Sequence, residues 1–172
     1  MFMIENDFSK ARSAAFALAR SWEAHMKDAS DKTRVCLNEM RKTCIDVICR
    51  TGYADDSVYD SLEKSYINNV ISTEPDFDEI GKTLDALAAI NSHKAASLLY
   101  HFLHGLHQKK RVGPWSDTEN VVFPWVLNSL AILKLEFRHA WDLLVTICCS
   151  GHYTAEERIF ARDTLIRMKG GI

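Results

Sequence analysis

The feature that most constrains this chain is a helical spacing of apolar residues along almost its whole length. Between positions 8 and 168 they recur three and four residues apart, as in Ala11, Ala15, Leu18 and Trp22. Such spacing gives an α-helix one apolar face. Only three prolines and seven glycines occur in 172 residues, which favours long helices over short strands. The pattern therefore predicts an all-α protein of about eight helices.

Polar residues at the ends of these stripes predict the helix boundaries. Asp76 with Glu79, and Thr154 with Glu157, have the three-residue spacing of a capping box. Pro124 predicts a helix that starts close to it, near Phe123, because proline is tolerated in the first turn and disruptive deeper in. The other predicted boundaries are N-caps at Ser30 or Asp31 and at Ser92, an acidic first turn at Asp55 and Asp56, helix ends at Gly52 and Gly151, and a turn over 134–136.

Two stretches of the second half repeat one pattern, LDALAAINSHKAASLL (84–99) and LNSLAILKLEFRHAWDLL (127–144). The first-helix positions match at an offset of 43 residues and the second-helix positions at 45, with a two-residue insertion in the turn between them. The matched residues are Leu84, Leu87, Ala88 and Ile90 with Leu127, Leu130, Ala131 and Leu133, then Ala95, Leu98 and Leu99 with Ala140, Leu143 and Leu144.

This pattern resembles a HEAT repeat, in which a helix ending in Leu-Ala-x-Ile or Leu-Ala-x-Leu is followed by a tight turn and Ala-x-x-Leu-Leu. The offset falls in the roughly 40–47 residue period of HEAT and armadillo repeats. FARDTLIRM (160–168) resembles the first helix of a truncated repeat, and 33–71 an earlier degenerate one. The chain lacks the family's usual proline early in the first helix and the Asp and Arg around the turn, so a compact helical bundle is the alternative fold.

The resemblance implies an all-α fold, a right-handed α-solenoid or superhelix of antiparallel helix pairs. Small alanines let paired helices approach closely, and a hairpin that cannot bury its apolar face alone must stack on its neighbours. We expect a single helical-repeat domain over 1–172, with degenerate N-terminal helices over 1–72 and clearer HEAT-like repeats over 76–168.

Three histidines, His101, His104 and His107, are the one run that suggests chemistry. Three residues fall about 60° short of a full helical turn, so His101 and His104 share a face from which His107 drifts. Zinc needs about four ligands, and the run holds no carboxylate, HExxH or CxxC motif. We therefore interpret the histidines as the edge of an amphipathic helix, and keep His101 and His104 as candidate metal ligands.

Partner binding is predicted near the loop at Gly113 and Pro114. Trp115, Phe123 and Trp125 flank this loop, and aromatic residues are favoured anchors at interfaces. The alternative is that they staple the loop onto the core. Lys109, Lys110 and Arg111 precede it, where cations also offset the negative end of a helix dipole. The candidate partner-binding residues are therefore Trp115, Phe123, Trp125, Lys109, Lys110 and Arg111.

The composition and charge of the chain argue against several classes of protein. A formal charge of −2 argues against a protein that grips the nucleic-acid backbone. No apolar run approaches the roughly 18 residues of a membrane-spanning helix, and no secretory signal is recognisable, so we expect a cytoplasmic protein without membrane contact. The five cysteines form no CxxC and are interpreted as buried hydrophobes in a reducing compartment.

These observations predict a non-catalytic protein–protein interaction or scaffold module of HEAT-repeat type. Its partner would be another protein, or a second copy of the chain through the apolar end of a short solenoid. We expect no cofactor and assign no catalytic residue, because no nucleophile motif or phosphate-binding loop is present. The alternative is a metal-dependent or nucleic-acid-modifying enzyme on a HEAT-like fold that uses the region of His101, His104 and His107.

Overall fold

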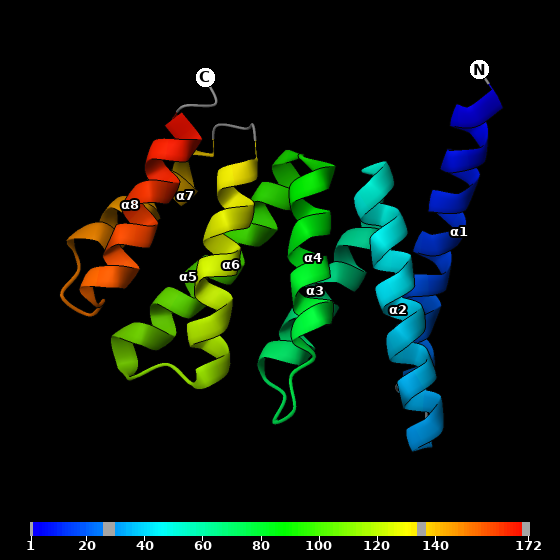
Figure 1. Ribbon diagram of the computed structural model, residues 1–172, viewed down its shortest axis with the longest axis horizontal. Helices are drawn as coiled ribbons and strands as arrows, with labels where there is room; N and C mark the ends of the chain where they lie inside the picture. Colours follow the sequence, from blue (N-terminus) through cyan, green and yellow to red (C-terminus); the bar gives the residue numbers. More distant parts are fainter. Residues whose placement is uncertain (1, 26–29, 134–136, 170–172) are drawn as a thin grey trace. The chain divides into compact units, whose positions relative to one another are not determined.

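The computed structural model describes residues 2–25, 30–133 and 137–169, and within these ranges all regular secondary structure is helical (Figure 1). The prediction of an all-α protein is confirmed. The described ranges contain α1 (Phe2–His25), α2 (Asp31–Thr51), α3 (Asp56–Val70), α4 (Phe77–Ile90), α5 (His93–Val112), α6 (Asp117–Ile132), α7 (Arg138–Cys149) and α8 (Ala155–Lys169).

The chain forms two compact units, Met1–Ile90 and Asn91–Ile172. In the first unit α1 packs on α2 and α3, and α4 packs on α2 and α3 (Figure 1). Its core is aliphatic, and each such side chain contributes about 1.5–3 kcal/mol when fully buried. The central buried residues of this unit are Leu18, Ile45, Ile48, Leu62, Ile80, Leu84 and Leu87.

Local capping explains where the helices of the first unit begin and end. Ser30 and Asp55 accept hydrogen bonds from the backbone N–H groups three residues ahead, which confirms the predicted starts of α2 and α3. Gly52 ends α2 with a φ of 62°, in the left-handed region that favours glycine.

Only half of the capping box predicted at Asp76 is formed. The Glu79 N–H donates to Asp76 Oδ1 at 3.0 Å, as predicted, but the Glu79 carboxylate turns inward to Arg41. Asn69 Oδ1 instead accepts the hydrogen bond from the Asp76 N–H, at 3.1 Å. The expectation of a complete box is therefore wrong, because a buried cation competes for the Glu79 side chain.

In the second unit α5 packs on α6 and α7, and α8 packs on α6 and α7. The predicted caps at Ser92 and at Thr154 with Glu157 are confirmed: Ser92 accepts from the Ala95 N–H, and Thr154 and Glu157 bond each other reciprocally. The central buried residues of this unit are Leu99, Leu103, Phe123, Leu127, Leu130, Leu144 and Ile147.

The predicted start of α6 near Phe123 is wrong. The helix begins at Asp117, where Ser116 and Glu119 form a complete capping box, so Pro124 lies inside it. Proline in a helix interior cannot donate the backbone hydrogen bond to the residue four positions earlier. The reciprocal cap fixes the start despite that loss.

The matched repeat residues are almost all buried, Leu84, Leu99, Leu127 and Leu144 among them. Within the second unit, α8 packs on both α6 and α7, and α5 packs mainly on α6, whereas the repeat pattern predicts pairing of the helices over 127–133 and 140–144. Solenoid stacking and its handedness stay predictions. The turn expected over 134–136 lies outside the described residues. Within the described ranges, no helix has both the length and the apolar character needed to cross a bilayer.

Candidate functional site

The three histidines of α5 do not converge on one point. His101 is exposed and His104 partly exposed, whereas His107 is buried, with 6% of its surface accessible. His107 Nδ1 lies 2.9 Å from Tyr153 Oη in a hydrogen bond, and the two rings stack with an interplanar angle of 4°. His101 and His104 instead surround the Tyr100 ring, at centroid distances of 5.5 and 5.8 Å.

Burial and neighbouring charge favour the neutral form of His107. Burial lowers the pKa of its imidazole below the ordinary value of 6.5, and the positive charges of Arg111, His104 and His152 act in the same direction. Burial also raises the pKa of the Tyr153 hydroxyl. His107 and Tyr153 therefore form a hydrogen bond between two neutral side chains in the core. Among the residues that the structure describes, no three His, Cys, Asp or Glu side chains are grouped so as to hold a metal ion.

The aromatic residues near the 113–116 loop pack inward. Trp115 is 7% exposed and Phe123 1% exposed, and their ring centroids lie 4.7 Å apart. Trp115 Nε1 donates to the Leu106 carbonyl oxygen at 2.9 Å, and the Tyr153 ring meets Trp115 edge-on. The rings therefore anchor the loop to the core and have little surface to offer a partner. Trp125 is half-buried.

The basic residues that close α5 differ in their contacts. Lys109 Nζ lies 2.5 Å from Glu119 Oε1. Lys110 Nζ lies 2.8 Å from Glu157 Oε1 and 4.2 Å from the centroid of the Trp115 ring. Arg111 is exposed. Lys109 and Lys110 thus pair with acids of the fold. A partner-binding role for the six candidate residues stays a prediction.

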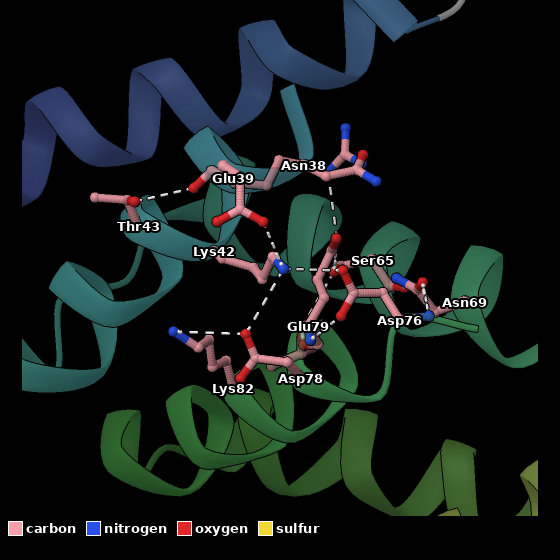
Figure 2. Close-up of polar contacts among 12 residues, drawn as sticks. Asn38, Glu39, Lys42, Thr43, Ser65, Asn69, Asp76, Asp78, Glu79 and Lys82 are labelled. Carbon is pink, nitrogen blue, oxygen red and sulfur yellow. Dashed lines mark hydrogen bonds and ion pairs between the residues drawn. The ribbon is translucent and has the colours of Figure 1, made fainter. Parts of the chain in front are cut away.

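A buried ion pair lies in the first unit, where the sequence suggested no site. Arg41 of α2 is 3% exposed and Glu79 of α4 1% exposed, and Arg41 Nε lies 3.3 Å from Glu79 Oε1. Ser65 of α3 donates to the same oxygen (Figure 2). The Arg41 guanidinium also stacks over the Trp22 ring, 4.3 Å from its centroid. Side chains of α1, α2, α3 and α4 thus meet around one charge pair that is closed to solvent.

A sequence signal for this pair existed. Glu79 shares a helix face with Thr83 and Leu87, both buried, so it is an acid inside an apolar stripe. A buried acid is stable only when it is paired with a cation, hydrogen-bonded or kept neutral. The sequence did not indicate which cation, because Arg41 is 38 residues earlier on another helix.

Lys42 and Lys82 form ion pairs with acids of α2 and of the start of α4 (Figure 2). Lys42 Nζ lies 2.8 Å from Glu39 and 3.1 Å from Asp76, and the hydrogen bond to Glu39 is the largest cause that raises the pKa of Lys42. Lys82 bridges Asp46 at 2.7 Å. These contacts tie α2 to α4 and to the residue that precedes it.

The outward face of α8 carries exposed apolar side chains. Ala161 and Thr164 are its buried residues, whereas Ile159, Phe160 and Ile166 are 48%, 53% and 61% exposed. Ile159 and Ile166 are seven residues apart and so project from one side of the helix. Phe160, the first residue of the stretch FARDTLIRM that resembles a repeat helix, is thus exposed and lies outside the core. Apolar side chains gathered on an exposed face are typical of interaction surfaces.

No protein-family model, no curated protein and no solved structure matches this chain.

Proposed function

We propose that the chain is a non-catalytic protein–protein interaction module of helical-repeat type, and that the outward face of α8 is its docking surface. The observation that carries the proposal is the exposure of Ile159 and Ile166 on that face, with Phe160, also exposed, at its edge about 100° round the helix from Ile159. The water-facing side of a surface helix is normally polar. An apolar one gains free energy when a partner covers it.

Two buried ionisable side chains, Glu79 and His107, support a structural role for the chain instead of a catalytic one. Glu79 and His107 are 1% and 6% exposed, and each is engaged by side chains of the fold, Arg41 and Tyr153 respectively. A general acid or base must reach the proton it transfers. Neither side chain can reach a substrate from these positions.

Site-specific photo-crosslinking in the organism that encodes the protein tests the proposal. A benzoylphenylalanine in place of Phe160 should give discrete adducts, because this side chain lies at the edge of the docking surface. The same probe in place of Val112, which is 91% exposed at the end of α5, is the matched control and should give none.

Adducts at position 160 should also disappear when Ile159→Ser and Ile166→Ser are combined with the probe. If positions 160 and 112 give the same pattern, or position 160 gives none, the α8 face is not a docking surface and the proposal fails.

A further inference from the structure

We infer that His107 of α5 and Tyr153 form a pH-sensitive switch, which holds the loop 150–154 on the second unit at neutral pH and releases it when the imidazole of His107 takes up a proton. Both residues lie in the second unit, and the switch does not depend on the proposed docking surface. Two features carry it: a single side chain attaches the loop, and positive charges surround the imidazole.

One side chain attaches the loop between α7 and α8 to the core. The structure describes all of residues 150–154, and of these only Tyr153 is buried, with 4% of its surface accessible. The centroid of its ring lies 5.6 Å from that of Trp115 and 5.9 Å from that of Phe123, and its hydroxyl is hydrogen-bonded to His107. The residues on either side of it are exposed. The position of the loop therefore depends on Tyr153 and on the imidazole that stacks against its ring.

Protonation of His107 is unfavourable while the loop is in place. Burial lowers the pKa of the imidazole below the ordinary value of 6.5, and Arg111, His104 and His152 act in the same direction through their positive charges. Lys110 Nζ adds a cation 6.0 Å from the centroid of the phenol ring that stacks on the imidazole. A proton on His107 therefore brings another positive charge into a buried site that is already surrounded by cations.

The acids next to this part of α5 already have partners. Glu157 of α8 accepts a hydrogen bond at each carboxylate oxygen, from Lys110 Nζ at 2.8 Å and from the Thr154 N–H at 2.7 Å. Glu119 Oε1 of α6 lies 2.5 Å from Lys109 Nζ. The other acids of α6, α7 and α8 are exposed, namely Asp117, Asp142, Glu156 and Asp163. A protonated imidazole is thus best stabilised by water, which reaches it when the loop moves away.

The different surroundings of the imidazole in the two states make opening depend on pH. In the open state the imidazole is in water, where its pKa is about 6.5, whereas in the closed state the pKa of His107 is lower. Between these two values the open state binds more protons, so the equilibrium constant for opening rises as the pH falls. From about pH 7.5 to about pH 5.5 the rise should be up to about tenfold for one proton.

Amide hydrogen exchange of the full chain at about pH 7.5, 6.5 and 5.5, corrected for the intrinsic exchange rate at each pH, tests the inference. Peptides that cover 150–158 should lose protection by up to about tenfold over this range, because the N–H groups of Thr154 and Arg158 are hydrogen-bonded where the loop joins α8. Peptides from the core of α6 and from the first unit should keep their protection. Equal losses there would show global unfolding and overturn the inference.

His107→Gln places a side chain that stays neutral at this position, so the protection of 150–158 should no longer change with pH. His101→Gln, at an exposed position of the same helix, is the matched control and should behave as the original chain does. Tyr153→Phe removes the hydroxyl but keeps the ring, so the loop should open more at every pH and retain its pH dependence. Unchanged protection of 150–158 down to about pH 5.5 in the original chain, or the same loss in the His107→Gln chain, overturns the inference.

Discussion

At the scale of single residues, the buried Arg41–Glu79 pair gives the sharpest stability prediction. Glu79→Ala leaves a guanidinium that is 3% exposed without its counter-charge, so we expect the free energy of unfolding to fall by about 3–5 kcal/mol. Denaturant unfolding measures it. The matched control is Asp46→Ala, which breaks the partly exposed pair with Lys82 and should cost less than about 1 kcal/mol.

The double variant Arg41→Met with Glu79→Leu removes both charges and should lose much less stability than the sum of the two single variants with those substitutions. Additive losses would show that the two side chains are energetically independent despite their 3.3 Å contact.

His107 gives a prediction about pH. Its pKa in the folded chain is below the ordinary value of 6.5, so between those two values the unfolded chain binds more protons. The free energy of unfolding should therefore fall as the pH drops from 7.5 towards 5, by no more than about 1.4 kcal/mol per pH unit for one proton.

Thermal or denaturant unfolding at several pH values measures this slope. His107→Gln should flatten it, while His101→Gln, at an exposed position, should leave it unchanged. Equal slopes in all three chains would show that other groups control stability in this window.

At the scale of the helix, Pro124 in the interior of α6 predicts a stabilising substitution. Pro124→Ala restores an N–H that can donate to the Asn120 carbonyl, so the free energy of unfolding should rise by about 1–3 kcal/mol. Pro114→Ala in the preceding loop is the control and should instead lose about 0.4–1 kcal/mol through a more flexible unfolded chain. A loss at position 124 would mean that the helix requires the proline ring for packing.

The sequence was sufficient to predict those helix ends that depend only on residues a few positions away. Ser30, Asp55 and Ser92 act as caps, and Gly52 ends a helix, because each needs only residues a few positions away. The start of α6 differs from the prediction because two local signals compete there: Pro124 favours a start close to itself, whereas Ser116 and Glu119 form the capping box that sets the observed start.

Contacts between distant helices could not be predicted in this way. The periodicity of α1 and α8 identified apolar residues, yet Phe8 and Phe160 are 59% and 53% exposed. Which part of an apolar stripe is covered depends on the neighbouring helices. The inward turn of Glu79 towards Arg41 depends in the same way on α2, and the α8 face became visible as a candidate site only through exposure.

At the scale of the whole molecule, the two compact units predict how the chain behaves when divided. Each unit has its own buried aliphatic core, and about 80–90 residues suffice for independent folding. The fragments 1–90 and 91–172 should each be helical and unfold cooperatively, as judged by circular dichroism during heating. A fragment without a cooperative transition would support the single domain expected from the repeat pattern.

The contact between Arg41 and Trp22 also gives the first unit an optical reporter. Trp22 is the only tryptophan of residues 1–90, whereas Trp115, Trp125 and Trp141 belong to 91–172. The Trp22 indole is 8% exposed and lies against a guanidinium, so its emission wavelength should be sensitive to loss of this packing. In a chain with the other three replaced by phenylalanine, fluorescence would follow the unfolding around Trp22 alone, and the first unit would acquire a melting curve of its own.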